Sequence, residues 1–161
     1  MRKQTWLFAC LILLGFSGPQ AVTAADPRFI DNGDGTITDR QQGLMWAQRD
    51  NQADIFWRDS QAWVQSTFPE SISKRYDDWR LPAIVELQSL YREDVGYAGY
   101  VAECGQRVKI APLFQISCIL LWSSESALGI PLAFDFQLGS AFTMDPSEKS
   151  GCRVLAVRTL K

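Results

Sequence analysis

Histidine is absent from the 161-residue sequence. Imidazole is the side chain that titrates near neutral pH, and it is the commonest nitrogen ligand for metals. Its absence excludes histidine-based catalytic triads and imidazole metal sites.

The sequence contains fewer basic than acidic residues: 16 Lys and Arg against 18 Asp and Glu, which gives a net charge of −2. Nucleic acids and anionic membrane surfaces are bound by clustered cations. We therefore expect no nucleic-acid partner. The acidic balance also favours a neutral glycan or a protein partner over a sulfated glycan.

The apolar run near the amino terminus is too short to span a membrane. "WLFACLILLGF" covers 11 residues, whereas a spanning helix needs about 20. Arg2 and Lys3 precede the run, and the small residues of "AVTAAD" follow it. This order is typical of a secretory signal peptide.

We expect residues 1–25 to be this signal peptide, with cleavage after Ala24 or Ala25, and residues 26–161 to form a single domain. No membrane span is expected after cleavage, and the product would be exported, to the periplasm or the extracellular space. A lipoprotein anchored through Cys10 is the alternative. It is disfavoured because most of the apolar segment follows that cysteine, whereas lipidation needs it before.

Three cysteines lie beyond the expected cleavage site: Cys104, Cys118 and Cys152. Exported compartments permit disulfides. A bond between Cys104 and Cys118 would close a loop of about 15 residues and stabilise the fold by about 3 kcal/mol through chain entropy. Pairings through Cys152 stay open at this point. We interpret the remaining thiol as a buried small apolar residue, with a nucleophile, a redox group or an intermolecular crosslink as alternatives.

The stretch "DNGDGTITDRQQGLMW" begins like a calcium-binding loop. Counted from Asp31, the third and fifth positions fall on Gly33 and Gly35, which have no side-chain oxygen, and the twelfth falls on Gln42 instead of Glu. A count from Asn32 fails as well. The EF-hand pattern is thus absent.

Turn chemistry explains the same stretch. Asn-Gly and Asp-Gly steps between "RFI" and "TIT" predict a hairpin, and "DRQQG" predicts a second turn before the strand "LMWA". A weak calcium site is retained as an alternative, with Asp31, Asp34 or Asp39 as ligands. No other cofactor is expected.

Two amphipathic helices are predicted next. In "ADIFWRDSQAWVQSTF" apolar residues recur every three or four positions, with Asp54 as the expected N-cap and the tryptophans interpreted as core packing. In "RLPAIVELQSLYR" we expect Pro82 in the first helical turn, and Ile84, Leu87 and Leu90 or Tyr91 on one face.

The last third of the chain predicts a long ordered loop followed by strands. Residues 93–114 show no sustained period, and such loops are where binding sites usually lie. The strands are "CILLWSS", "LAFDFQLG", "SAFTM" and "CRVLAVR". Because the last is apolar on both faces, we expect it to be a central strand.

These motifs, in this order, resemble the Lcl C-terminal domain family, which is named after a Legionella collagen-like adhesin. "RFIDNGDGTITDRQQGLMWA", "YDDWRLPAIVEL", "LWSS" and "VLAVR" carry the resemblance, which spans Arg28 to Arg158. It implies an α+β fold of the C-type-lectin-like class, similar to formylglycine-generating enzymes. In such a fold two helices flank a small antiparallel sheet, the terminal strands pair, and a long loop region supports recognition.

The resemblance assigns motif positions that we interpret as mostly structural: Trp46, Asp78, Trp79, Arg80, Leu81, Pro82, Glu86, Trp122, Ser123 and Ser124. Arg80 is expected to be a buried partner of Asp78 or Glu86. Ala83 stands where family members generally have Thr. The helix cap is thereby lost, so that Asp78 or the backbone must compensate.

The function expected from this resemblance is that of an exported, non-catalytic binding or adhesion module, with a glycan or protein partner recognised through the loop surface. An accessory component of a periplasmic or cell-surface assembly, docked through Cys152 or an exposed aromatic patch, is one alternative. An enzyme like the formylglycine-generating proteins is the other. The adjacent acids Asp77–Asp78 and Glu93–Asp94 could do acid/base work, but such pairs usually form a solvated face.

Overall fold

The computed structural model describes residues 27–161, and the predicted signal peptide lies outside the described residues. The described chain is a mixed α+β structure with two helices, two four-stranded sheets and one two-stranded sheet. The α+β class was thus predicted correctly. Within residues 27–161 the helices are all too short or too polar to cross a bilayer.

The first sheet contains the predicted hairpin. β1 (Phe29–Asp31) and β2 (Thr36–Asp39) are antiparallel, and the turn between them contains two glycines with positive φ angles of 73° and 88°. β3 (Leu44–Ala47) follows the second predicted turn and pairs with β2. β10 (Val157–Thr159) completes the sheet, in the order β1-β2-β3-β10. The hairpin prediction is confirmed.

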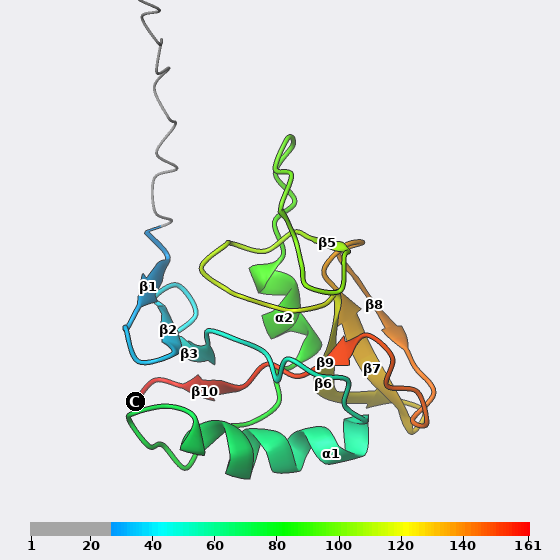
Figure 1. Ribbon diagram of the computed structural model, residues 1–161, viewed down its shortest axis with the longest axis horizontal. Helices are drawn as coiled ribbons and strands as arrows, with labels where there is room; N and C mark the ends of the chain where they lie inside the picture. The colour runs from blue at the N-terminus through cyan, green and yellow to red at the C-terminus, as the bar shows by residue number, and fades with distance from the viewer. Residues whose placement is uncertain (1–26) are drawn as a thin grey trace, which may run out of the picture.

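The second sheet lies at the other end of the molecule (Figure 1). Its strands stand in the order β8-β7-β6-β9, and the β6–β9 pair is parallel whereas the others are antiparallel. Their bounds are β6 Leu120–Ala127, β7 Ile130–Asp135, β8 Ser140–Thr143 and β9 Cys152–Arg153. The predicted long loop contains a further small hairpin of β4 (Tyr100–Val101) and β5 (Arg107–Val108).

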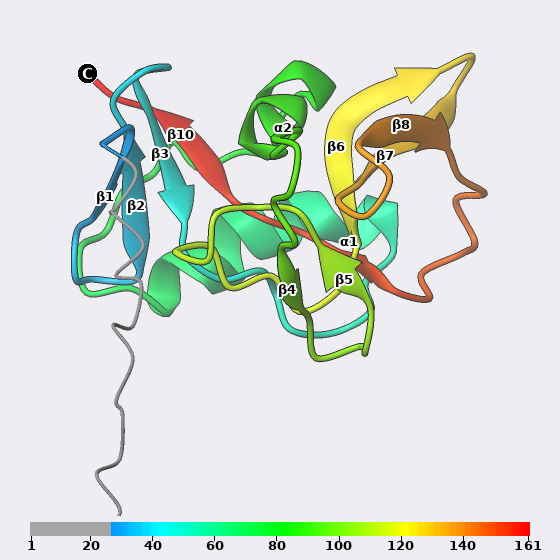
Figure 2. The same ribbon diagram turned by 90° about the horizontal axis from the view of Figure 1, so that it is seen from above.

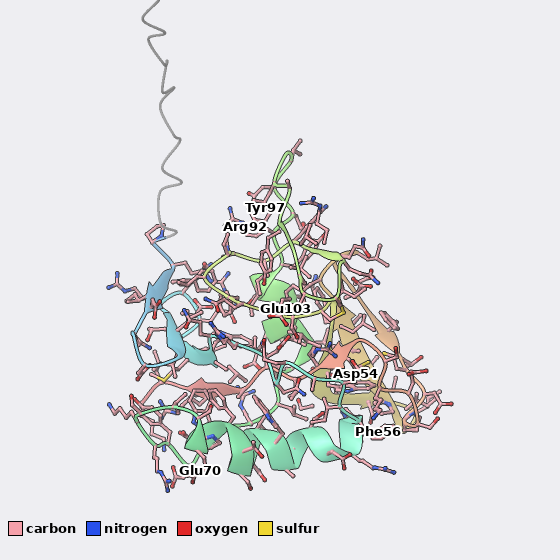
Figure 3. The ribbon with its side chains drawn as sticks, in the orientation of Figure 1. Asp54, Phe56, Glu70, Arg92, Tyr97 and Glu103 are labelled. Atoms are coloured by element: carbon pink, nitrogen blue, oxygen red, sulfur yellow. A yellow bond between two sulfur atoms is a disulfide. The ribbon has the colours of Figure 1, made fainter. Side chains whose placement is uncertain are left out.

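The first helix runs along one side of the molecule, from the second sheet toward the first (Figure 1). α1 (Trp57–Ala62) continues into a π-helical turn, η1 (Trp63–Thr67), and a 3-10 turn, η2 (Phe68–Glu70). Phe56 and Glu70 mark its two ends in Figure 3. The predicted N-cap is wrong: Phe56 holds that position, and Asp54 instead accepts a hydrogen bond from the Gly151 N–H at 3.1 Å.

The second helix, α2 (Ile84–Leu90), lies between the two sheets when the molecule is seen from above (Figure 2). Its apolar face is the predicted one, because Leu87 and Leu90 are buried at 0% and 1% exposure. Pro82 lies just before the N-cap, Ala83, and so falls outside the first turn in which we expected it.

The predicted central strand "CRVLAVR" is divided between the two sheets. Its first two residues form β9 and its last two belong to β10, and each strand is the edge strand of its sheet. The sequence is apolar on both faces, as in a central strand, because the segment crosses the core between the sheets. Residues 154–157 are completely buried there. β10 pairs with β3, whereas β1 lies at the opposite edge, so the terminal strands share a sheet without pairing directly.

Candidate functional site

A cleft of about 430 Å³ lies between the segment that follows β3 and the helical turns η1 and η2. Residues 48–52 form one wall, and Trp63, Thr67 and Ser71 contribute to the other. We call this hollow the 48–52 cleft. Figure 1 shows the segment crossing the molecule from β3 toward the start of α1.

The main chain of the 48–52 wall is tied to three other parts of the fold. The Gln48 N–H donates to the Gly35 carbonyl at 2.9 Å, and the Gln48 carbonyl accepts from the Gln115 N–H at 2.8 Å. Asn51 donates its N–H to the Val154 carbonyl at 3.1 Å, and its side-chain oxygen accepts from the Val154 N–H at 2.9 Å. The wall is therefore fixed by the hairpin, the long loop and the C-terminal segment together.

A buried carboxylate, Asp50, holds the same wall from the interior of the protein. Asp50 is 3% exposed, and it accepts hydrogen bonds from the Ser117 N–H at 2.6 Å and from the Gln52 N–H at 2.9 Å. The Ser117 hydroxyl also donates to Asp50, at 2.9 Å, and in turn accepts from Arg153 Nε at 2.8 Å. Burial raises the pKa of the Asp50 carboxyl, although the hydrogen bonds from Ser117 and Gln52 oppose that shift.

This anchor has a conformational consequence for Gln52. Its φ angle is 58°, in the left-handed region that residues other than glycine seldom adopt. Both its N–H and its side-chain amide donate to Asp50, the latter at 2.7 Å. The hydrogen bonds to the buried carboxylate thus hold the exposed end of the wall in an unfavourable backbone conformation.

The opposite wall is aromatic. Trp63 is half-buried, and its ring packs on Phe68 with centroids 5.5 Å apart and planes tilted by 32°. Phe68 is itself held edge-on by Trp79 at 4.8 Å. Trp63 begins the π-helical turn, and such turns are frequent at functional sites. The indole is thus supported from behind while part of it stays accessible.

The cleft presents hydrogen-bonding groups with one cation. Arg49 is exposed, and its side chain forms no ion pair with any residue between 27 and 161. The Gln48 amide donates to Asp31 at 3.1 Å, which orients it. Amides, hydroxyls and an indole are suited to binding and orienting a polar ligand.

The three calcium candidates stabilise two turns: Asp31 and Asp34 the turn between β1 and β2, and Asp39 the turn before β3. Asp31 accepts from the Gly33 N–H at 2.8 Å, and Asp34 accepts from the Thr36 hydroxyl at 2.5 Å. Asp39 is buried and forms an ion pair with Arg28. In the part of the chain that the structure describes, no three Asp, Glu, Cys or His side chains are grouped so that they could hold a metal ion.

The cysteines follow the predicted pattern. Cys104 and Cys118 form a disulfide with their Cα atoms 5.3 Å apart. Cys152 is a free thiol at 0% exposure, with its Sγ 3.6 Å from Met144 Sδ. Burial raises the pKa of Cys152 to about 12, so the thiol is protonated at neutral pH. Its interpretation as a buried small residue is confirmed.

Most of the motif residues belong to the core, as predicted. Trp46, Trp79, Leu81 and Trp122 are between 0% and 4% exposed. Pro82 and Ser123 are also buried, whereas Ser124 is exposed.

Two reciprocal hydrogen bonds fix the entry to α1 against β6. Trp122 donates its indole N–H to the Ile55 carbonyl at 2.8 Å, and Trp57 donates to the Ser123 carbonyl at 2.8 Å. The Trp-Ser step of the motif therefore positions the segment that leads from the cleft wall into the helix.

The polar motif residues form two ion pairs. Arg80 binds Glu86 through two hydrogen bonds of 2.6 and 2.8 Å, but its side chain is 40% exposed, so the expectation of a buried arginine is wrong. Asp78 pairs with Arg158 at 2.5 Å. The hydrogen bond from Arg158 lowers the pKa of Asp78.

The missing cap of α2 is replaced by glutamates. The Ala83 N–H donates to Glu86 at 2.7 Å, and the Ile84 N–H donates to Glu125 at 2.9 Å. Asp78, which we expected to compensate, is instead engaged by Arg158. Glu125 comes from β6, so the helix start is completed by a residue distant in sequence.

The predicted recognition loop carries charges that neutralise one another. Arg92 and Asp94 form an ion pair at 2.6 Å, and the hydrogen bond from Arg92 lowers the pKa of Asp94. The Arg92 guanidinium also lies 5.0 Å from the Tyr97 ring centre, and both side chains lie on the projecting part of the loop in Figure 3. A wide, open depression of about 630 Å³ adjoins it, beside α2.

Sequence reasoning missed the residues that build the 48–52 cleft. Asp50, Ser117 and Arg153 meet in the interior although 67 residues separate the first two and 36 the last two. One signal was available: the polar run "QRDNQ" directly follows the apolar strand "LMWA" and precedes the helix. No feature of the sequence near Ser117 indicated that it would bind Asp50.

A family model described as "Lcl C-terminal domain" matches residues 35–158. A search of curated proteins found no match. The matched range contains all ten motif residues, both disulfide cysteines and every residue that anchors the 48–52 wall. Because this range is well over half of the chain, the protein belongs to the Lcl C-terminal domain family.

Proposed function

We propose that the protein is an exported, non-catalytic binding module with a C-type-lectin-like fold, and that it recognises a neutral glycan in the 48–52 cleft. The amino-terminal pattern supports export. The disulfide between Cys104 and Cys118 is consistent with an oxidising compartment.

The observation that carries the proposal is the pairing of a partly accessible indole with an amide wall whose main chain is already fixed. Sugar rings have apolar faces that pack on aromatic rings and hydroxyls that exchange hydrogen bonds with amides. Trp63 offers the first surface, and Gln48, Asn51 and Gln52 border the second. Because Asp50 and Ser117 fix the wall in advance, binding needs little additional ordering.

The size of the cleft is consistent with a small ligand. Small-molecule sites commonly measure about 300–1,000 Å³, and this cleft measures about 430 Å³. Arg49 adds a donor that can bind a hydroxyl or ring oxygen.

Three observations favour binding over catalysis. The sequence has no histidine. The Cys152 thiol is buried and its pKa is raised to about 12 by burial, so it is a poor nucleophile. Of the two acid pairs named from the sequence, each has a member engaged by arginine: Asp78 by Arg158 and Asp94 by Arg92.

An accessory role in a surface assembly is the second candidate. It is favoured by exposed apolar side chains on the second sheet and its turns, among them Leu128 at 103%, Leu138 at 70% and Phe142 at 37% exposure. A protein partner, in place of a glycan, would suit that surface.

The experiment is an array of neutral and anionic oligosaccharides probed with fluorescently labelled protein, in the presence of calcium and of EDTA. Wild type should bind neutral glycans in both buffers, and Trp63→Ala should lose that signal. Phe142 is a partly exposed aromatic residue outside the cleft, so Phe142→Ala serves as the matched control and should bind normally. Equal binding by Trp63→Ala, or binding of anionic glycans alone, would contradict the proposal.

A further inference from the structure

The two four-stranded sheets have four edges, and three of them are closed or charged. The outer side of β10 is bonded to Arg80, which exchanges N–H and carbonyl hydrogen bonds with Val157 at 2.9 and 3.0 Å. The short β9 is covered by the chain before α1, through the Ile55 N–H to Cys152 carbonyl bond at 3.2 Å. β1 is only three residues long and ends in the exposed Asp31.

The fourth edge, β8, has none of these protections. Its sequence Ser-Ala-Phe-Thr contains no charge and no proline, all four residues are exposed, and β7 is its sole neighbour among the described strands. Natural proteins usually protect such edges with lysine, proline, bulges or a covering segment, because an open edge pairs with other chains.

The hydrogen-bond pattern shows which groups are free to pair. The Met144 N–H donates to the Pro131 carbonyl at 2.9 Å, so residue 144 faces β7. In an antiparallel ladder, inward and outward residues alternate. Phe142 and Ser140 therefore direct their main-chain groups toward β7, whereas Ala141 and Thr143 direct theirs outward.

Apolar side chains accompany this open edge. Phe142 is 37% exposed within the strand, and Leu138 is 70% exposed in the turn before it. A strand added beside β8 would bury part of these side chains while its backbone pairs with the edge.

The charge beside β8 favours a basic peptide over a second copy of the chain as the added strand. Of the four acids between residues 120 and 150, Asp135 is buried and Glu125 binds the start of α2. The single base of this stretch is Lys149, whose ammonium lies 5.0 Å from the Phe56 ring centre. Asp145 and Glu148 follow β8 directly and are exposed. A second copy that paired through its own β8 would bring the same acidic flank, whereas a basic strand would meet these carboxylates with cations.

We propose that β8 is a docking edge for an extended, basic peptide segment of another protein, which adds to the second sheet as a fifth strand. Ala141 and Thr143 supply the main-chain hydrogen bonds, Phe142 the apolar contact, and Asp145 and Glu148 the charge preference. This edge is separate from the 48–52 cleft, so peptide binding at β8 and glycan binding in the cleft can be tested independently.

The test uses a fluorescein-labelled peptide of alternating Lys and Val, with blocked ends, titrated into residues 26–161 and followed by anisotropy. One comparison peptide replaces every Lys with Glu. The other carries N-methyl groups on every amide, so that neither of its edges can donate main-chain hydrogen bonds. Thr143→Pro removes an outward N–H from the edge strand, and Thr143→Val is the matched control that alters only the side chain.

We expect the Lys-Val peptide to bind and the Glu-Val peptide not to bind. Thr143→Pro and N-methylation should each weaken binding by about ten-fold, since main-chain hydrogen bonds carry the affinity. Thr143→Val should leave it unchanged. N-methylation changes only the peptide, so it tests the main-chain hydrogen bonds even if the proline variant unfolds.

Four results would overturn the proposal: equal binding of the Glu-Val peptide, binding insensitive to N-methylation, no binding at millimolar peptide, or a dimer that dissociates on dilution and is abolished by Thr143→Pro. The last result would assign the edge to a second copy of the chain.

Discussion

The two four-stranded sheets share one C-terminal segment but end differently. The first sheet is closed by Arg80 at β10 and by a charged, short β1, and the concave 48–52 cleft lies beside it. The second sheet ends at β8 in an uncharged, exposed strand. The two proposed functions therefore rest on different chemistry: side chains in a preformed hollow beside the first sheet, and main-chain pairing at a strand edge in the second.

The shared segment fixes the two sheets in matching ways. Arg153 on β9 pairs with Asp54, and Arg158 on β10 pairs with Asp78. Both arginines are buried, at 9% and 7% exposure. Each sheet is thereby attached by one ion pair to a residue far away in the sequence, on either side of α1.

The largest expected effect comes from breaking the segment itself. Leu155 is 0% exposed between the sheets, and Leu155→Ala should lower the free energy of unfolding by about 2–5 kcal/mol. Leu138→Ala, at a 70% exposed position, should change it by less than about 0.5 kcal/mol. Urea unfolding followed by tryptophan fluorescence measures both. A small loss for Leu155→Ala would show that the segment does not join the sheets.

A smaller effect is expected where the segment reaches the cleft. Ser117→Ala removes the hydroxyl between Asp50 and Arg153 and should lower the free energy of unfolding by about 1–3 kcal/mol. Glycan affinity should fall with it, because the wall loses its anchor. The exposed Ser124→Ala is the control. Unchanged affinity in a folded Ser117→Ala protein would show that the anchor does not shape the cleft.

Acid should weaken the attachment of both sheets. Hydrogen bonds from Arg153 and Arg158 lower the pKa values of Asp54 and Asp78 below their ordinary value. Each carboxylate therefore stabilises the fold above its unfolded pKa, and that contribution is lost as pH falls through the folded pKa, from about pH 4 downward.

Asp54→Asn and Asp78→Asn should each make the free energy of unfolding depend less steeply on pH in the acid range. Urea titration at several pH values measures this dependence. The decrease in slope should be larger for Asp78, whose side chain is 28% exposed, than for Asp54 at 42%. An unchanged slope in both variants would contradict the matching roles of the two pairs.

The smallest effect concerns the hairpin beside the cleft. Asp34→Ala removes two hydrogen bonds to Thr36 and should cost about 0.5–1.5 kcal/mol. Millimolar calcium should leave the melting temperature of wild type unchanged, as measured by scanning fluorimetry. A calcium-dependent rise that disappears in Asp34→Ala would instead identify a metal site in the turn.

Local chemistry explains which parts of the fold could be predicted. Asn-Gly and Asp-Gly steps favour one kind of turn wherever they occur, so the first hairpin followed from the sequence. The apolar spacing of Leu87 and Leu90 likewise predicted the buried face of α2. These signals depend on neighbours within a few residues.

The errors arose where distant residues compete with local preference. Asp54 is a reasonable helix cap by position, but Arg153, 99 residues away, binds its carboxylate instead. The apolar run "VLAV" indicated burial without indicating that it passes between two sheets. The cleft was missed for the same reason, because Asp50 becomes an anchor only when Ser117 is brought beside it.

Glycan binding in the 48–52 cleft is tested most directly by an NMR titration of residues 26–161 with the neutral oligosaccharide that binds best on the array. The indole N–H signals report Trp46, Trp57, Trp63, Trp79 and Trp122 separately. If the glycan binds in the 48–52 cleft, the Trp63 indole and the amides of residues 48–52 should shift together while the amides of β8 stay in place. Shifts confined to β8 and its flanking turns, with the Trp63 signal unmoved, would contradict it.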